Sequence, residues 1–434
     1  MLRLAQIWRV TLVAAVMIGL ATFTAFAQAP NTTSLDRPLR VFIDCRGPGC
    51  DQAFFRTELA WIDHVRDQMD ADVHVLVTAQ GTGGGGTEYT LRFIGQSGWQ
   101  GQEDTFTRAT EAGGTDDDRR RALVQAFGLG LARFAAVTPV GLQLRIASPA
   151  AITAPLQTVA KADGWNFWVF RTNLNLNLNG EQSNSSRSFN VNQSATRTTA
   201  EWKVNFNAGV NRSTNAYELS SGNFVTTRRG WNVNGLTVKS LNDHWSVALK
   251  GGASRSTFLN QKLAARFAPG VEFNVFPYAQ STSRTLILQW TVGPNRFVYD
   301  EPTIYGKLDE SRWEQTALAQ LNLRQPFGTV GLATEIASYL DHPDHYRFVF
   351  NADTEFRVSR GLTLRLDGNY QVLHDQLYLR RGTSTDEEII ARQRQLQTSY
   401  RYLVSIGLTY RFGSINNNVV NPRFGGGPGG GFPF

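Results

Sequence analysis

Hydrophobic and polar positions alternate strictly along much of the chain after residue 164, most clearly at 165–179. Three leucines there fall on one side of an extended strand and four asparagines on the other: Leu174, Leu176 and Leu178 against Asn173, Asn175, Asn177 and Asn179. One apolar face and one polar face are typical of a wall between hydrocarbon and water. Two tryptophans and two phenylalanines at the start of the segment suit a membrane interface. The pattern predicts a membrane-spanning β-strand.

Runs of the same kind recur up to residue 412 and predict an all-β antiparallel transmembrane barrel of about twelve strands over 164–413. The expected strands are 165–179, 187–199, 201–216, 224–240, 244–257, 261–276, 283–299, 312–325, 328–341, 345–359, 361–378 and 399–412. Connections after even-numbered strands are short and those after odd-numbered strands are generally longer. An even count with short periplasmic turns places both ends of the barrel in the periplasm. Closure of the barrel pairs the first strand with 400–412.

The alternation also assigns an inner face to the barrel. The expected lumen-facing residues are Arg171, Asn175, Asn177, Asp353, Glu355, Arg357, Arg365, Asp367 and Arg411. A turn at 359–361 sets Val358 opposite Leu362, Glu355 opposite Arg365 as an internal ion pair, and Asp353 opposite Asp367. Two facing carboxylates repel each other unless an arginine, a cation or a raised pKa relieves them.

Residues 39–138 have a different character and predict a small α+β domain in the periplasm. Short strands are expected at 39–44, 73–79, 89–94 and near 105, and helical spacing covers 51–67 and 118–136. The segments 73–79 and 89–94 form a hairpin around the glycine loop 81–86. That loop has neither the Lys-Ser/Thr nor the following helix of a phosphate cradle, which favours a hairpin tip.

The remaining segments complete the organisation of the chain. Residues 1–27 have the basic start, apolar run and small residues of a signal peptide, and 28–38 form a leader. The segment 139–163 is a linker rich in Ala, Pro and Thr, and 414–434 is a Gly-rich tail that we place in the periplasm. For residues 383–397, a solvated outer loop is favoured over a segment that gates the entry of a ligand.

Composition and charge narrow the function classes. The formal charge of +7 includes Arg3 and Arg9 of the signal peptide, which holds no Asp or Glu, so the mature chain carries 7 − 2 = +5. No stripe of Lys and Arg with interleaved aromatics appears, which argues against nucleic-acid binding. Cys45 and Cys50 are the two cysteines and predict a disulfide in an exported chain, with zinc binding as the alternative.

Several short strings resemble a family of uncharacterised bacterial outer-membrane β-barrel proteins with an N-terminal periplasmic α+β domain. They are VFIDC at 41–45, DVHVL at 72–76, GTGGGGTEYTLRFIG at 81–95, NDHWSV at 242–247, FPY at 276–278 and NNNVVNPRFG at 416–425. The likeness covers essentially the whole mature chain and implies an architecture rather than an activity. The strand and helix order of the N-terminal domain is also similar to periplasmic domains of the TolB and CsgG kind, which engage envelope partners.

Two places in the sequence are candidates for metal binding or catalysis. The run Asp341, His342, Asp344 and His345 holds metal-ligating groups in an expected outer loop, but a solvated turn at Pro343 explains it equally well. His374 stands near the barrel wall, as the base of a lipid hydrolase resembling outer-membrane phospholipase A would, yet nothing assigns it a serine. We therefore expect no catalytic residue, no cofactor and no bound metal.

The sequence predicts a non-enzymatic outer-membrane β-barrel, either a pore or an envelope scaffold, whose periplasmic domain 39–138 docks partner proteins. A lipid hydrolase and an assembly or secretion factor are the alternatives. The expected partners are outer-membrane lipid, a periplasmic protein and the barrel-assembly machinery, since the last strand ends in the aromatic motif Tyr410, Arg411, Phe412.

Overall fold

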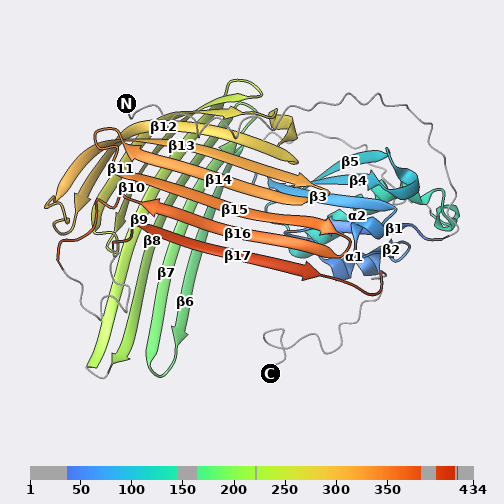
Figure 1. The fold of residues 1–434 in the computed structure, drawn as a ribbon, viewed down its shortest axis with the longest axis horizontal. Coiled ribbons are helices and arrows are strands. Elements are labelled where there is room, and N and C mark those ends of the chain that lie inside the picture. The colour runs from blue at the N-terminus through green and yellow to red at the C-terminus, as the bar shows by residue number, and fades with distance from the viewer. Residues whose placement is uncertain (1–36, 145–163, 220–221, 383–396, 416–417, 419–434) are drawn as a thin grey trace, which may run out of the picture. The chain divides into compact units, whose positions relative to one another are not determined.

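The computed structural model describes residues 37–144, 164–219, 222–382, 397–415 and 418. They form a five-stranded mixed sheet with two α-helices, followed by a twelve-stranded antiparallel sheet (Figure 1). The predicted signal peptide, most of the leader and linker, nearly all of the loop 383–397 and most of the tail lie outside the described residues. No helix of the described part of the chain is long and apolar enough to cross a membrane.

The N-terminal sheet has the strand order β2-β1-β3-β4-β5. Strand β1 runs parallel to both β2 and β3, whereas β3, β4 and β5 are antiparallel. The predicted hairpin is confirmed, because β3 and β4 pair from Val73 opposite Gly95 to Gly81 opposite Thr87. The elements are β1 (Arg40–Cys45), α1 (Gln52–Glu58), β2 (Asp63–His64), η1 (Gln68–Asp70), β3 (Val73–Gly81), β4 (Thr87–Gly95), η2 (Ser97–Trp99), β5 (Glu103–Thr110), α2 (Asp116–Ala135) and η3 (Pro139–Leu142).

The helix expected over 51–67 is wrong in length, because α1 ends at Glu58. The backbone of Asp63 donates to Leu39 O at 2.9 Å and that of Val65 donates to Val41 O at 3.0 Å. These bonds add β2 to the sheet beside β1, so the buried side chains of Ile62 and Val65 belong to a strand edge rather than to a helix face.

The two faces of the N-terminal sheet have different surroundings. Val41, Val75 and Phe93 lie in a core that includes Phe127 and Phe134 of α2. That helix begins with a capping box, in which Thr115 and Asp118 hydrogen-bond each other's backbone. Successive strand residues point to opposite faces, so the intervening positions of β1 and β3 leave the helix-covered core.

The predicted disulfide is confirmed. Cys45, at the end of β1, is bonded to Cys50, just before α1. Their Cα atoms are 5.5 Å apart. The bridge closes the loop that leads from the sheet into the first helix.

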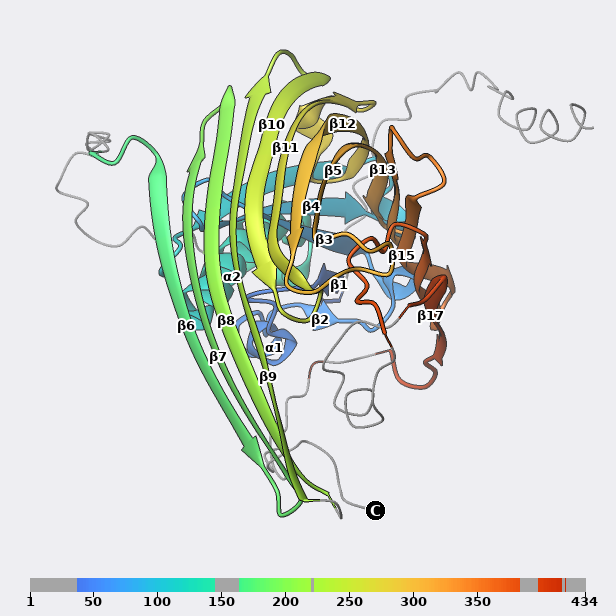
Figure 2. The ribbon, with the colours of Figure 1, turned by 90° about the vertical axis from the view of Figure 1, so that its left-hand side faces the viewer.

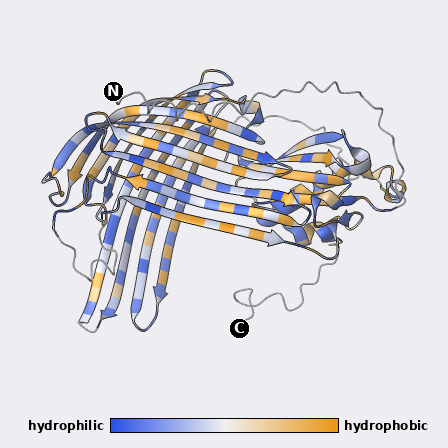
Figure 3. Cartoon of the chain, viewed as in Figure 1, coloured by the Kyte–Doolittle hydropathy of each residue, from blue (hydrophilic) through white to orange (hydrophobic). Residues whose placement is uncertain are grey.

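The predicted count of twelve barrel strands is confirmed, and each strand pairs with its neighbours along the chain. Polar and apolar residues alternate along these strands in Figure 3. The strands are β6 (Trp168–Gly180), β7 (Asn184–Thr198), β8 (Trp202–Leu219), β9 (Gly222–Ser240), β10 (Trp245–Ser256), β11 (Gln261–Asn274), β12 (Arg284–Tyr299), β13 (Asp309–Gln325), β14 (Gly328–Tyr339), β15 (Tyr346–Ser359), β16 (Leu362–Leu373) and β17 (Tyr400–Tyr410), with η4 (Tyr278–Gln280) before β12.

The two ends of the large sheet differ in their connections. We call one the short-turn end, which includes the two-residue turns 326–327 and 360–361. The opposite long-loop end carries the connections 300–308, 340–345 and 374–399. Strand β6 starts and β17 finishes at the short-turn end, as an even number of strands requires.

The strand expected over 361–378 ends earlier, because β16 stops at Leu373. The chain then folds inward rather than continuing the sheet. Gln376, Leu377 and Leu379 are buried, and Arg380 forms an isolated antiparallel bridge with Thr303. The beginning of the longest loop therefore lies against the inside of the long-loop end.

The expected pairing of 165–179 with 400–412 is not formed. Strands β6 and β17 are the two edges of the sheet and each pairs on one side only (Figure 2). The expectation rested on the general need to close a sheet in lipid. Strand β6 pairs with β7 along its whole length, β17 pairs with β16, and β6 is followed by the longer strands β7 to β9, of 15, 18 and 19 residues.

Two glycines of α2 provide a test of packing in the N-terminal domain. A β-carbon on Gly130 would lie 2.1 Å from the ring of Phe93, whereas one on Gly128 would meet nothing within 4 Å. We expect Gly130→Ala to destabilise the domain by about 1–3 kcal/mol through overpacking. Gly128→Ala should stabilise it by about 0.5–1 kcal/mol through helix propensity. Urea unfolding, monitored through the hydrogen exchange of residues 37–144, measures both changes in stability. Equal changes in the two variants would contradict this packing.

The two faces of β6 provide a test of orientation in the large sheet. Leu176 is 66% exposed on the apolar face and lies opposite Phe189, while Asn177 donates to Ser188 Oγ at 3.3 Å. Leu176→Arg should destabilise the folded protein in vesicles by about 2–4 kcal/mol. Asn177→Ser should cost less than about 1 kcal/mol. Urea unfolding in lipid vesicles measures this, and the reverse order would mean that the faces are exchanged.

Candidate functional site

The inner face of the large sheet encloses a cavity of about 660 Å³. Strands β8 to β15 contribute to it together with the folded-in segment after β16. Its lining combines acidic, basic and tyrosine side chains with small residues such as Gly252 and Ala265. This is the best candidate for a functional site in the large sheet, because it is concave and polar groups from many strands converge on it.

One charge cluster of the cavity is built on β11, β12 and β13. Arg266 Nη1 lies 2.9 Å from Glu314 Oε1, and its Nη2 donates to Thr316 Oγ1 at 3.1 Å. The amide of Asn295 donates to the second oxygen of Glu314. Glu314 is 7% exposed, so its charge is compensated by direct partners rather than by bulk water.

A second cluster fastens the folded-in segment to the wall. Arg347 Nη1 donates to Asp375 Oδ2 at 2.7 Å, and its Nη2 donates to Glu335 Oε1 at 3.0 Å. Arg347 and Glu335 lie on neighbouring strands, whereas Asp375 follows β16. The guanidinium of Arg347 thus links the beginning of the long loop to two strands of the wall.

The two clusters leave the cavity close to neutral. Its basic residues are Lys250, Arg266 and Arg347, and its acidic residues are Glu314, Glu335 and Asp375. The phenol groups of Tyr299, Tyr339 and Tyr378 add apolar rings with polar tips. A surface of this kind suits a small polar solute without an excess of either charge.

None of the charged or tyrosine residues of this cavity was among the predicted lumen-facing residues. A signal was present, because Glu314 and Thr316 alternate with apolar Trp313 and Ala317 inside a predicted strand. This alternation could have assigned Glu314 and Thr316 to the inner face, but it could not show that a loop residue, Asp375, lines the same cavity. That contact depends on where the chain turns after β16.

Five of the predicted lumen residues lie on β15 and β16 with the expected register. Glu355 is opposite Arg365 and Asp353 is opposite Asp367, although a bulge at Val358 pairs Ser359 rather than Val358 with Leu362. Arg365 Nε donates to Asp367 at 2.8 Å, and Arg365 Nη2 lies 3.8 Å from Asp353. An arginine therefore stands between the two facing carboxylates.

The expected ion pair between Glu355 and Arg365 is wrong. Both oxygens of Glu355 instead accept from Arg46, which follows β1, at 2.5 and 2.6 Å. The sequence predicted the pairing from the strand register alone. Arg46 of the N-terminal domain lies close to the short-turn end of the sheet and binds the carboxylate of Glu355, while Arg365 binds Asp367.

Arg357 makes the most enclosed contact between the N-terminal domain and the large sheet. Its guanidinium donates to Asp44 Oδ2 at 2.5 Å and to Pro326 O at 2.7 Å, and it stacks 5.2 Å above the ring of Phe42. The side chains of Arg357 and Asp44 are 13% and 12% exposed. Desolvated, two-sided contacts of this type are stronger than surface ion pairs.

Further contacts extend this junction along the short-turn end. Arg360 Nη2 lies 2.6 Å from Asp70 Oδ1, and the backbone of Gly361 donates to Asp67 Oδ2 at 2.6 Å. Arg324 Nη1 donates to Ala79 O, in β3, at 3.3 Å. The junction therefore involves the turns of β13 to β16 on one side and β1, η1 and β3 on the other.

The tip of the β3–β4 hairpin reaches the other edge of the large sheet. A β-carbon on Gly83 would lie 2.6 Å from Cβ of Thr198, at the end of β7. One on Gly85 would lie 3.0 Å from Nη2 of Arg171, in β6. The same hairpin thus contacts β13 through Ala79 and the β6–β7 edge through its glycine loop.

The other predicted lumen residues are dispersed. Asn175 and Asn177 lie on the edge strand β6, opposite Asn190 and Ser188 of β7. Arg411 follows β17, and its backbone donates to Gly361 O at 2.7 Å. It lines a second cavity, of about 730 Å³, between β1, η1 and the short-turn end. The structure does not bring these three residues into the main cavity.

His74 lies beside this junction on the face of the N-terminal sheet that is turned away from the helices. Its side chain is fully buried, its ring is 5.2 Å from that of Phe42, and its Nε2 is 3.7 Å from Asp44 Oδ2. Burial lowers the pKa of His74, and this outweighs the opposing effect of Asp44. Burial alone would raise the pKa of Asp44, but its neighbours His74 and Arg357 lower it to about 2.

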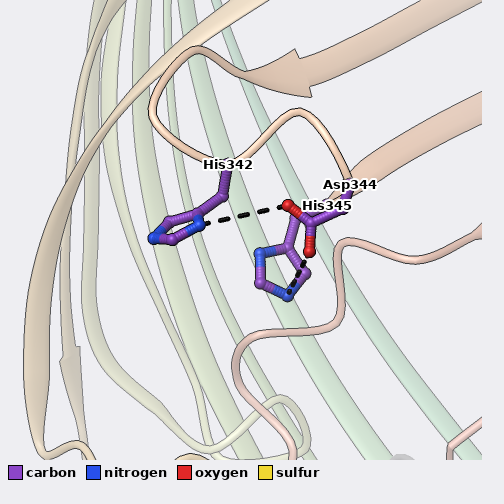
Figure 4. Close-up of side chains that lie close together, drawn as sticks. All are labelled: His342, Asp344 and His345. Atoms are coloured by element: carbon purple, nitrogen blue, oxygen red, sulfur yellow. Dashed lines mark ion pairs between the residues drawn. The ribbon is translucent and has the colours of Figure 1, made fainter.

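Both candidates for catalysis or metal binding, His374 and the group of His342, Asp344 and His345, lie at the long-loop end. The ring of His374 packs 4.9 Å from that of Tyr346, and no serine hydrogen-bonds to that ring among the described residues. The side chains of His342, Asp344 and His345 do come together in the loop between β14 and β15 (Figure 4).

Residues 176–327 match the family model described as protein of unknown function, DUF481. This span covers β7 to β13, with the end of β6 before them. No curated protein matches the chain.

Three solved structures show similarity to the chain. The translocator domain of the autotransporter NalP from Neisseria meningitidis has 12% sequence identity and a TM-score of 0.28, over 56% of this chain and 88% of that one. The ferric enterobactin receptor from Pseudomonas aeruginosa has 12% identity and a TM-score of 0.29, over 47% of this chain and 38% of that one. The CymD monoaromatic hydrocarbon channel has 8% identity and a TM-score of 0.23, over 76% and 83%. At these values the matches carry no activity across to this chain.

The buried histidine predicts an acid-sensitive N-terminal domain. The unfolded chain takes up a proton at His74 below the ordinary pKa of 6.5, whereas the folded domain resists protonation. The contribution of neutral His74 to the free energy of unfolding is therefore fully present above about pH 6.5. It declines as the pH falls toward the lowered pKa of His74 in the folded state. We expect the urea midpoint of residues 37–144 to fall over this window.

His74→Leu should reduce this pH dependence, leaving the part that His64 contributes, since burial also lowers the pKa of His64. His342→Ala, in a loop of the large sheet, should leave the dependence unchanged. Hydrogen exchange of the full-length protein in urea, at pH values from 5 to 8, measures the midpoint. An unaltered profile in His74→Leu would refute the assignment.

Proposed function

We propose that the protein is an outer-membrane channel for small polar solutes, closed at its periplasmic end by its own N-terminal domain. The observation that carries the proposal is the polar, nearly neutral cavity of about 660 Å³ on the inner face of the large sheet. A non-conducting scaffold has no need to gather six charged side chains around one cavity, where partial desolvation of Glu314 and its neighbours opposes folding.

The orientation follows from the connections of the large sheet. Short turns face the periplasm and long loops face outward in outer-membrane barrels. The contacts of Asp44, Arg46 and Asp70 are made at the short-turn end. The N-terminal domain is therefore periplasmic, and the folded-in segment held by Arg347 and Asp375 narrows the outer half.

The contacts of the N-terminal domain support a closing role rather than a free docking module. One sheet face of the domain is occupied by α2, and residues of the other face contact the large sheet through Phe42 and Asp44. The β3–β4 hairpin contacts both β13 and the β6–β7 edge. A domain that is held both at β13 and at the β6–β7 edge lies across the periplasmic opening of the sheet. It blocks this opening until those contacts are broken.

An enzymatic activity has less support. A lipid hydrolase needs a nucleophile within hydrogen-bonding reach of its base. His374, the candidate base, packs against Tyr346, and its backbone rather than its ring makes the bond to Tyr346 O, at 2.9 Å. We propose that the protein is not an enzyme and that His374 supports the long-loop end.

Single-channel recording in a planar bilayer tests the proposal. The variant Arg357→Asp with Glu355→Arg keeps the net charge but sets like charges against Asp44 and Arg46. We expect its open probability to rise at least about tenfold over the wild type, since tenfold corresponds to about 1.4 kcal/mol and the enclosed contact of Arg357 with Asp44 contributes about that much or more. Adding Asp44→Arg and Arg46→Asp should restore closure.

A matched control lies on the neighbouring strand. Arg365→Asp with Asp367→Arg exchanges the same two kinds of charge on the same face, but the ion pairs that these residues form with each other and with Asp353 lie within β15 and β16. This control should not change the open probability. An equal increase in both double variants would refute closure by the domain, and the absence of current in every variant would refute the channel.

A further inference from the structure

The loop between β14 and β15 brings together three side chains that bind transition metals. The imidazoles of His342 and His345 and the carboxylate of Asp344 each present a donor atom, and these atoms lie within 4.8 Å of one another (Figure 4). Asp344 projects its two oxygens toward the two rings, at 4.0 Å from His342 Nδ1 and 4.0 Å from His345 Nε2. From the sequence we expected a solvated turn here and no bound metal.

The loop is held by contacts that do not use the three donor groups. The backbone of His345 donates to His342 O at 2.9 Å, and that of Tyr339 donates to His345 O at 3.3 Å. The side chain of Asp341 pairs with Arg312, which in turn binds Glu310 at 2.9 Å. The turn is therefore fixed in shape before any ligand binds, which lowers the entropic cost of binding.

The two imidazoles keep their nitrogen lone pairs available. Separations of 4.0 Å from Asp344 are too long for hydrogen bonds. Nδ1 of His345 is buried and has no hydrogen-bond partner among the described residues. The ring of His345 is held instead by an edge contact with Tyr305, with the ring centres 5.6 Å apart. The nitrogen of His345 that faces Asp344 is Nε2, so Nε2 is the atom that would bind a cation held by these three residues.

We propose that His342, Asp344 and His345 form a binding site for a divalent transition metal such as Zn²⁺ or Ni²⁺. Two imidazoles with one carboxylate favour these ions, whereas Ca²⁺ and Mg²⁺ prefer sites made of oxygen ligands. Ligand bonds of about 2.1 Å in a tetrahedron place the donor atoms about 3.4 Å apart. The donor atoms, which lie within 4.8 Å of one another, therefore need to approach by up to about 1.4 Å, which the half-exposed side chain of His342 and the exposed side chain of Asp344 permit by rotation.

The remaining coordination positions face solvent. The side chains of His342 and Asp344 are 51% and 74% exposed, so water completes the sphere and the ion exchanges freely with the medium. The site lies in one of the long loops, on the side that the proposed orientation places outside the cell. Metal binding there does not depend on whether the large sheet conducts.

Calorimetric titration of the full-length protein in detergent, purified without a polyhistidine tag, tests the site. We expect Zn²⁺ and Ni²⁺ to bind saturably at pH 7.5 with one ion per chain, and Ca²⁺ not to compete. His342→Ala and His345→Ala should each weaken binding at least roughly tenfold, because loss of even an outer-shell partner costs that much. Asp344→Asn should weaken it by a smaller factor.

His244→Ala is the matched control. His244 lies in a turn at the opposite end of the sheet, and its Nδ1 is already engaged with Asn274 O at 2.7 Å. This variant should bind as the wild type does. Absence of saturable Zn²⁺ binding, equal losses in His244→Ala and His342→Ala, or binding that survives both His342→Ala and His345→Ala would overturn the proposal. If Zn²⁺ binding were lost in His374→Ala but retained in His342→Ala, the site would lie elsewhere, which would also overturn the proposal.

Discussion

The pairing of main-chain groups is the constraint on which the large sheet depends, because hydrocarbon offers no hydrogen bonds to an unpaired amide or carbonyl. Strands β6 to β17 meet this constraint in the simplest order, each beside its neighbour in the chain. Local hairpins then fix the register one turn at a time. The exceptions are β6 and β17, which pair on one side only, so the edges of the sheet are its least constrained strands.

Once the wall is fixed, the inner face must compensate its own charges. Glu314 has Arg266 and Asn295 as partners, and Arg347 has Glu335 and Asp375. Each group therefore joins at least two elements, and the second group includes a loop residue. Ion pairing on the inner face is thus also one of the means by which the segment after β16 is held inside. The polar lining and the narrowing at the long-loop end have a common physical cause.

Much of the fold could be predicted because a strand has a side-chain period of two whatever its surroundings. This period gave the twelve strands, and the tight turn before Leu362 gave the pairing of Glu355 with Arg365 and of Asp353 with Asp367. It could not give ionic partners that are distant in sequence. Glu355 binds Arg46, 309 positions away, because the two domains meet there. The shortness of α1 was also hidden, since Ile62 and Val65 are buried in either arrangement.

The junction of the two sheets shows how alternation serves a soluble domain as well as a membrane wall. In β1, Val41 and Ile43 enter the core under the helices, so Phe42 and Asp44 must point the other way. On a free domain this second face would expose an aromatic ring and leave His74 beside solvent. Here Arg357 covers Phe42 and neutralises Asp44, and His74 is fully enclosed. A single arginine of the large sheet therefore completes the burial of the small one, which makes the stability of the N-terminal domain depend on its attachment.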